Sequence, residues 1–208
     1  MRLDQYDSSG FTRGRPLWVE ALWWLIQACL VRSWIPGSPH RRFLLRLFGA
    51  QIGQGVIIKP GIRVKFPWLL QVGDHTWIGE DVWIDNLAPI KIGSHCCLSQ
   101  GAYLCTGSHN WRSTAFDLIV RPIEIQDSAW VCARTVVAPG VTIKEGAVLA
   151  LGGVATTDLE AWGMYVGAPA KWVKARSAKT QSRDHAAVRT DTSRRESTLD
   201  PQPVDRSN

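Results

Sequence analysis

Residues 125–155 read IQDSAWVCARTVVAPGVTIKEGAVLALGGVA, and an aliphatic residue stands at every sixth position of this stretch. A period of six fits neither the 3.6-residue repeat of a helix nor the two-residue alternation of a simple strand. It is typical of a β-helix, in which three short strands and three turns make one triangular coil. The aliphatic side chains then point into the prism and form its core: Ile125, Val131, Val137, Ile143, Leu149 and Ala155.

The same spacing continues towards the N-terminus in three shorter runs: Ile52, Ile58, Val64; Val72, Ile78, Ile84; and Ile92, Leu98, Leu104. Two joins between runs are eight residues long, which is one hexad plus two inserted residues. The join from Leu104 to Ile125 is 21 residues long, so a loop over roughly 105–121 leaves the prism. Long loops on a rigid scaffold are usually functional. The sequence therefore predicts a mainly β fold, a single-stranded parallel β-helix of about five coils.

The flanking segments differ in composition from the repeat. We expect residues 1–16 to be a flexible leader and 17–50 to be a helical segment, with helices over 17–34 and 40–48. The second helix groups its apolar residues on one face and its arginines on the other. The β-helix domain spans 51–176 and ends in a C-terminal cap, read as a loop and a capping turn or helix. Residues 177–208 are polar, and we expect a disordered tail.

Charge and cysteine content narrow the classes of function. The net charge is +6, but residues 1–48 alone hold seven arginines against three acidic residues, so we expect no nucleic-acid partner. The apolar stretch 17–34 is too short and too polar to span a membrane. The basic segment 17–48 is suited either to cap the open end of the prism or to make peripheral contact with an anionic membrane. Both readings stay open. Five cysteines without zinc-type spacing, and no cleavable signal, indicate a cytoplasmic protein with no metal site.

Six motifs carry a resemblance to a known family. The central one is GAYLCTGSHNW at 101–111, and the others are VWIDN at 82–86, FDLI at 116–119, VAPGV at 137–141, VGAPAK at 166–171 and RFLLRLFG at 42–49. Together they resemble the hexapeptide-repeat acetyltransferases, in particular the colanic-acid-type polysaccharide O-acetyltransferases, over roughly residues 15–175. The resemblance implies a left-handed winding, a homotrimer and acetyl-CoA as co-substrate. The activity it implies is O-acetylation of a small or lipid-linked sugar in exopolysaccharide biosynthesis.

His109 is the candidate general base, because it lies in the extruded loop and an imidazole titrates near neutral pH. The resemblance implies that a polar residue of the preceding coil faces this histidine across a subunit boundary, and Asp85 is the matching residue. Asp85 could instead bond its own corner backbone, and the two readings are about even. Asn86, Asn110 and Trp111 are acceptor-binding candidates, although for Trp111 a packing role that anchors the loop is slightly favoured.

The donor residues follow from the resemblance alone. It implies that acetyl-CoA lies in a groove between two subunits along the later coils, beside Ala133, Gly152, Thr156 and Thr157. Relatives often carry Thr-Lys at that last pair, so Thr157 leaves the phosphate contact open. Lys171 and Lys174 are candidates for the phosphates of the nucleotide, or else a solvated basic edge.

Two other functions stay open: an acetyltransferase acting on an amino acid or antibiotic, and a non-catalytic β-helix scaffold. A β-helix carbonic anhydrase is excluded, because its zinc site needs histidines where this chain has Leu104 and Thr114.

Overall fold

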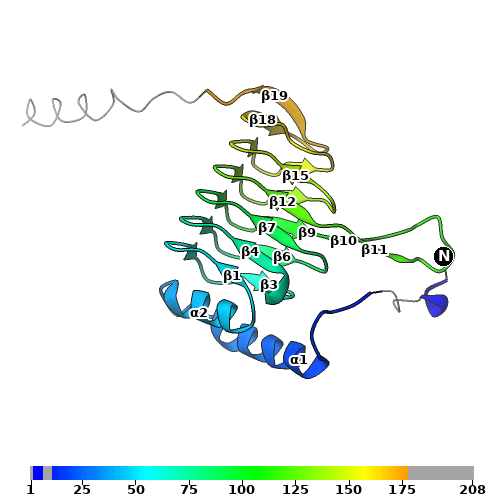
Figure 1. The fold of residues 1–208 in the computed structure, drawn as a ribbon. Helices are drawn as coiled ribbons and strands as arrows, with labels where there is room; N and C mark the ends of the chain where they lie inside the picture. The colour runs from blue at the N-terminus through cyan, green and yellow to red at the C-terminus, as the bar shows by residue number, and fades with distance from the viewer. Residues whose placement is uncertain (1, 7–10, 178–208) are drawn as a thin grey trace, which may run out of the picture. The chain divides into compact units, whose positions relative to one another are not determined.

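The structure, a computed structural model, describes residues 2–6 and 11–177, and one compact unit reaches as far as Arg176. In that unit two helices precede a stack of triangular coils, and a long hairpin leaves the stack (Figure 1). A short 3₁₀ helix, η1 (Leu3–Gln5), precedes α1, and a second, η3 (Pro67–Leu69), lies at a corner of the first coil. The predicted parallel β-helix is confirmed.

The strands line three faces of the prism, which we name A, B and C. Face A holds β1 (Gln51–Ile52), β4 (Leu70–Val72), β7 (Ile90–Ile92), β12 (Ile123–Ile125) and β15 (Thr142–Ile143). Face B holds β2 (Ile57–Ile58), β5 (Trp77–Ile78), β8 (Cys97–Leu98), β13 (Trp130–Val131), β16 (Val148–Leu149), β18 (Gly163–Val166) and β19 (Lys171–Ala175). Face C holds β3 (Arg63–Val64), β6 (Trp83–Asp85), β9 (Tyr103–Cys105), β14 (Val136–Val137) and β17 (Val154–Ala155).

The strand register explains the irregular joins in the sequence. Gln51 pairs with Gln71, twenty positions on, whereas Glu124 pairs with Thr142, eighteen positions on. The extra residues all lie where the chain passes from face C to face A, which we name the CA corner. Counted between the inward hexad positions, three CA joins are longer than one hexad: 64–72, 84–92 and 104–125. The insertions are therefore stacked along one edge of the prism instead of being scattered around it.

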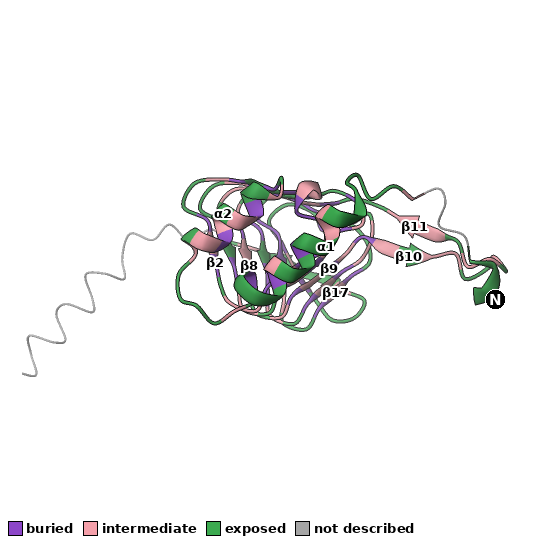
Figure 2. Cartoon of the chain, turned by 90° about the horizontal axis from the view of Figure 1, so that it is seen from below, coloured by how far each residue is buried: buried purple, intermediate pink, exposed green. Residues whose placement is uncertain are grey.

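The core is the one that the hexads predict. Every hexad position from Ile52 to Ala155 is buried, with an exposed fraction of at most 8%. Figure 2 shows buried residues along the inward side of the strands. A parallel ladder spaces neighbouring coils about 4.8 Å apart, so these side chains stack in continuous rows.

The N-terminal helices close the open end of the first coil. They are α1 (Leu17–Ile26), which continues into a π-helical turn, η2 (Gln27–Val31), and α2 (Pro39–Leu47). Trp23 Nε1 donates to Val64 O at 2.8 Å, and Val64 N donates to Gln27 Oε1 at 2.5 Å. Arg42 and Arg46 donate to carbonyl groups of the first coil at Val56 and Ile52. We expected these helices to lie either on the open end of the prism or on a membrane surface, and one side of them packs on the prism end.

The arginines of the second helix were predicted to lie on a polar face opposite its apolar residues, and Arg41 does not fit that prediction. It is fully buried instead of solvated, and its guanidinium donates to the carbonyl oxygens of Val31, Ser33, Ile35 and Gly37. The last turn of a helix leaves carbonyl groups unpaired, and a cation there is favourable. Arg41 therefore fixes the connection between the two helices.

The C-terminal cap is a strand pair, where we had expected a turn or a helix. β18 and β19 are antiparallel and extend face B beyond the fifth coil. Leu159 bridges to Ile143 and begins a sixth, incomplete coil. The tail predicted for 177–208 lies outside the described residues from 178 onward, as do residues 1 and 7–10 of the predicted leader.

Candidate active site

The extruded loop is a β-hairpin that carries His109 away from the prism. It consists of β10 (Gly107–His109) and β11 (Leu118–Val120), and His109 pairs with Leu118. Figure 1 shows the hairpin reaching out from the CA corner. His109 is half-buried at the distal end of its strand. The hairpin therefore presents the imidazole to whatever lies beside the prism, not to the prism itself.

Hydrogen bonding fixes the tautomer of His109. Its Nδ1 lies 2.9 Å from the carbonyl oxygen of Phe116, and a carbonyl can only accept, so Nδ1 carries the proton. The Phe116 ring stacks on the imidazole at 4.2 Å between centroids, and Tyr6 meets it edge-on at 5.7 Å. In the neutral ring the lone pair is therefore on Nε2, which is the arrangement that a general base needs.

The two predicted neighbours of His109 have different roles in the hairpin. The Asn110 side chain accepts a hydrogen bond from Arg112 N at 3.2 Å, and its backbone N donates to Asp117 O at 2.9 Å. Asn110 thus shapes the hairpin tip. Trp111 is 73% exposed, and the Arg112 guanidinium carbon lies 4.9 Å from the centroid of its ring. Its indole does not anchor the hairpin by burial.

Asp85 belongs to a polar row on the outward side of face C. Lys65 Nζ lies 3.4 Å from one carboxylate oxygen, and the Tyr103 hydroxyl donates to the other at 3.1 Å. Burial raises the pKa of Tyr103, and contacts with Cys105 and Asp85 add to the rise, so the hydroxyl stays protonated. The Asp85 carboxylate is therefore oriented by a cation on one oxygen and a hydroxyl donor on the other.

One chain does not bring Asp85 and His109 together. Asp85 pairs with Cys105, and four further residues lead from Cys105 out to His109. An extended chain of that length spans about 13 Å. The candidate base and the candidate orienting carboxylate therefore face different volumes within a single chain.

Asn86 has a structural position at the CA corner. It is fully buried, accepts a hydrogen bond from Phe66 N at 3.0 Å and donates to Phe66 O at 2.7 Å. From the same corner segment, Ala88 N donates to Oγ1 of Thr106, which lies in the corner of the next coil, at 3.0 Å. These bonds tie successive corners together, and they occupy the amide that we expected to bind the acceptor.

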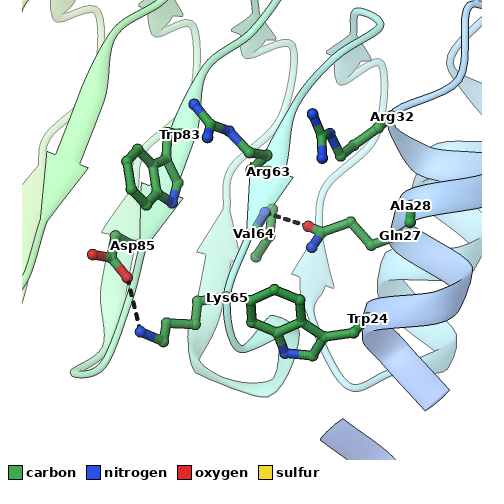
Figure 3. Close-up of a pocket in the computed structure, with 9 residues that line it drawn as sticks. All are labelled: Trp24, Gln27, Ala28, Arg32, Arg63, Val64, Lys65, Trp83 and Asp85. Atoms are coloured by element: carbon green, nitrogen blue, oxygen red, sulfur yellow. Dashed lines mark hydrogen bonds and ion pairs between the residues drawn. The ribbon is translucent and has the colours of Figure 1, made fainter. Parts of the chain in front are cut away.

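A cavity lies between the N-terminal helices and face C (Figure 3). Its volume is about 230 Å³, and Trp24, Gln27, Arg32, Arg63, Lys65, Trp83 and Asp85 are among its lining residues. The Arg63 guanidinium lies over the Trp83 ring at 4.3 Å, and Trp83 stacks on Tyr103 at 4.6 Å. Sequence reasoning identified only Asp85 of this set. The sequence does contain a signal for this set: Arg63 and Lys65 flank Val64. Because neighbouring strand residues point to opposite sides, an inward Val64 places both cations on the outward side of face C.

The predicted donor residues divide between the two edges of face C. Gly152 N donates to Ala133 O at 3.0 Å where the chain passes from face B to face C, and a Cβ at Gly152 would meet no atom within 4 Å. This open edge of small residues could receive a slender ligand. Thr156 and Thr157 follow β17 and lie at the opposite, CA edge.

The two predicted lysines are also separated. Lys171 follows Ala170, whose N donates to Val154 O, so this lysine lies near the Ala133–Gly152 edge. Lys174 pairs with Met164, further along β19. Both are exposed. Lys171 is therefore the one of the two that the fold brings near the other donor candidates.

Residues 2–6 and 11–177 contain no group of three or more His, Cys, Asp or Glu side chains that could hold a metal ion. Within the same residues, no helix has both the length and the apolar character needed to cross a bilayer.

Comparisons with known proteins agree with the fold and with the resemblance. No family model matches the chain. WcaF of Escherichia coli K12, a provisionally assigned colanic acid biosynthesis acetyltransferase, is 44% identical over 142 residues, which are 67% of this chain and 77% of WcaF. A hexapeptide-repeat acetyltransferase of Vibrio cholerae, crystallised with acetyl-CoA, superposes with a TM-score of 0.71 at 26% identity, over 77% of this chain and 88% of that one. A galactoside acetyltransferase in complex with coenzyme A shares the fold, with a TM-score of 0.69 at 17% identity, over 77% of this chain and 82% of the other.

Proposed function

The chain belongs to the hexapeptide-repeat acetyltransferases, and from that premise we propose that it moves an acetyl group from acetyl-CoA to a sugar hydroxyl in exopolysaccharide biosynthesis, with His109 as the general base. The enzyme class follows from the family, and the colanic-acid-like pathway from the similarity to WcaF. The observation that carries the assignment of the base is the bond between His109 Nδ1 and the Phe116 carbonyl oxygen.

The proposed reaction is a direct transfer within a ternary complex. Acetyl-CoA supplies a thioester, whose carbonyl carbon is attacked and whose thiolate leaves. His109 Nε2 takes the proton of the sugar hydroxyl as its oxygen bonds to that carbon, and it returns the proton to the departing thiolate sulfur. General base catalysis of this kind contributes about 10²–10⁴-fold. Asp85 accepts a hydrogen bond from the acceptor, because the one N–H of the neutral His109 ring already donates to the Phe116 carbonyl oxygen.

The separation of His109 from Asp85 within one chain favours a site shared between chains. We propose a homotrimer in which the hairpin of one subunit delivers His109 to face C of its neighbour. Aromatic and apolar side chains on the outward side of face B, such as Trp77 at 57% exposure and Trp130 at 45%, are suited to contact a second copy.

The donor is proposed to lie along the open edge formed by Ala133 and Gly152, with Lys171 near its phosphates. The absence of a side chain at Gly152 leaves room for a narrow pantetheine arm. Thr156 and Thr157, at the other edge of face C, reach the same donor only if it crosses that face or is held by the neighbouring subunit. Lys174 has the weakest claim, because it lies further along the strand.

The N-terminal helices also have a side that the prism does not cover. It carries exposed large apolar residues: Leu17, Trp18, Leu25, Leu30, Trp34, Ile35, Phe43 and Leu47. Exposed tryptophans beside other large apolar residues are typical of segments that lie in a membrane interface. We propose that this side makes peripheral contact with an anionic membrane. Flotation of the full chain with vesicles of anionic lipid, but not zwitterionic lipid, would support this contact, and flotation with neither would remove it.

The test of the activity is release of free thiol from acetyl-CoA by the purified full chain with a panel of sugars, amino acids and aminoglycosides. Sugar-dependent release with an O-acetylated product supports the proposal. Release with amino acids or antibiotics only would favour the other acceptors, and no transfer to any acceptor would favour a non-catalytic scaffold. Cys105→Ser should keep most of the activity, because direct transfer needs no thiol nucleophile.

A further inference from the structure

The cavity beside Asp85 has an excess of positive charge. Arg32, Arg63 and Lys65 line it against a single carboxylate, Asp85, so two positive charges are left over. Lys65 is paired with that carboxylate at 3.4 Å. Neither Arg32 nor Arg63 forms an ion pair with a carboxylate of the described residues 2–6 and 11–177. The excess therefore belongs to the two arginines.

Other arginines of the N-terminal segment are used differently. Arg41, Arg42 and Arg46 donate to backbone carbonyls, and Arg13 pairs with Glu20 at 2.9 Å. For Arg32 and Arg63 the structure gives no such side-chain bond within the described part of the chain. A guanidinium has five N–H donors in a fixed fork, and anions with several oxygens, such as phosphate and carboxylate, can accept two of these hydrogen bonds at once. The Arg63 guanidinium carbon also lies 4.3 Å from the centroid of the Trp83 ring, a cation–π contact that favours this position of the charge.

The cavity is polarised along face C. Arg32 lies near the edge where face B passes into face C, since its carbonyl accepts a hydrogen bond from Gly61 N. Lys65 and Asp85 lie at the CA edge, where the chain leaves face C. Figure 3 shows the two guanidinium groups towards one end and the Lys65–Asp85 pair towards the other. A ligand lying along the cavity would meet cations at one end and the carboxylate at the other.

We infer that the acceptor is a phosphorylated sugar, whose phosphoryl group is held by Arg32 and Arg63 while the hydroxyl to be acetylated lies towards Asp85. This inference rests on the proposed acetyl transfer and names its substrate class. The volume of about 230 Å³ is just below the ~300–1,000 Å³ usual for ligand pockets, so the cavity suits one sugar with its phosphate and leaves the rest of a larger acceptor outside. Trp24, 53% exposed, offers an aromatic face at the rim for the ring.

The experiment compares kcat/KM for matched acceptors with and without phosphate, such as galactose and galactose 1-phosphate, or glucose and glucose 1-phosphate. The wild-type chain should prefer the phosphorylated member at least about tenfold, since a charge-assisted bond contributes about 1.5–3 kcal/mol. Arg63→Gln and Arg32→Gln should each reduce that preference for the phosphorylated member about tenfold. Lys91→Gln, which removes an exposed cation on face A, is the matched control and should leave the preference unchanged.

Inorganic pyrophosphate gives a second readout that needs no acceptor chemistry. It should inhibit competitively against the phosphorylated acceptor, and Arg63→Gln should raise its inhibition constant about tenfold. Thermal unfolding of each variant, expected within a few degrees of wild type, separates lost recognition from lost folding. Equal kcat/KM for both members of each pair, a preference for glucuronate over glucose with none for phosphate, or an equal loss for all acceptors in Arg63→Gln would each overturn the inference.

The two sources of a phosphorylated sugar are distinguished by presenting it in two forms. One arm uses a soluble nucleoside diphosphate sugar, and the other uses a short polyprenyl diphosphate sugar in vesicles. Acetylation of either with the arginine dependence described above supports the inference and identifies the source. If the chain acetylates only unphosphorylated sugars, the inference fails while the proposed activity stands, and if it acetylates no acceptor, the proposed activity itself fails.

Discussion

Two corners of the prism behave in opposite ways. Where face A passes into face B the turns keep one length in every coil, and side chains of one coil bond the backbone of the coil before it. Asp74 accepts from Gln54 N at 2.7 Å, Ser94 from Asp74 N at 3.0 Å, and Asp127 from Ser94 N at 2.8 Å. At the CA corner the chain instead inserts residues three times in succession, ending with the hairpin.

The difference shows where a repeat protein can place function. A corner held by a ladder of bonds between adjacent coils cannot lengthen in one coil without breaking the ladder. The CA corner is fixed by buried pairs such as Asn86 with Phe66, which allow the chain beyond them to vary. Lys65, Asp85 and His109 all lie at or next to this corner. The predictions below change one corner or one end of the prism at a time.

The largest effect is expected from His109→Ala in the hairpin. The rate of acetyl transfer should fall about 10²–10⁴-fold, because the base is lost while both substrates can still bind. Steady-state thiol release measures it. Ser108→Ala, at an exposed position on the same strand, is the control and should keep near wild-type activity. Wild-type rates in His109→Ala would show that another group removes the proton.

Arg41→Met tests the helical end that closes the first coil. It leaves four backbone carbonyls without their donor, so we expect the free energy of unfolding to drop by about 3 kcal/mol. Chemical denaturation measures the drop. The same change at Arg112, on the hairpin, should cost no more than about 0.5 kcal/mol. An equal cost at the two positions would mean that Arg41 does not fix the helices.

Asn86→Ala compares the two corners directly. It unpairs the buried N–H and carbonyl of Phe66, which should cost about 1–3 kcal/mol of the free energy of unfolding. Ser94→Ala removes one solvent-exposed bond at the other corner and should cost under about 1 kcal/mol. If Ser94→Ala proved the more costly, the CA corner would not depend on its buried amide.

At neutral pH the smallest expected effect is that of Cys96, at the corner between faces A and B, because its contribution changes only in alkaline solution. Burial raises the pKa of its thiol from 9.0 to about 11. The folded state therefore keeps a proton that the unfolded state loses, so this contribution to stability is complete below pH 9 and is lost as the pH rises through 11. The free energy of unfolding should fall by about 1–3 kcal/mol over that range. Cys96→Ala should reduce the fall, whereas Cys29→Ala, at an exposed position, should leave it as in the wild type.

The sequence predicts the prism well, because each coil is made of neighbouring hexads and its register can be read from spacing alone. The same spacing predicts the inserted joins and identifies the segment that carries His109. It could not predict the Arg32–Arg63 cavity, which forms between a helical turn and strands more than thirty residues further on. The tautomer of His109 depends on a carbonyl across the hairpin, and Arg41 shows that an amphipathic pattern fails where a cation meets helix-end carbonyls.

The central claim is that His109 of one subunit acts at face C of another, and mixed oligomers test it most directly. His109→Ala and Asp85→Ala chains would be co-expressed with different tags, and oligomers containing both would be isolated and assayed. Each variant alone should be slow, while isolated trimers that contain both chains should recover about a third of wild-type activity, because one of their three interfaces has both residues intact. Activity no higher than that of the two variants alone, in oligomers shown to contain both chains, would contradict the shared site.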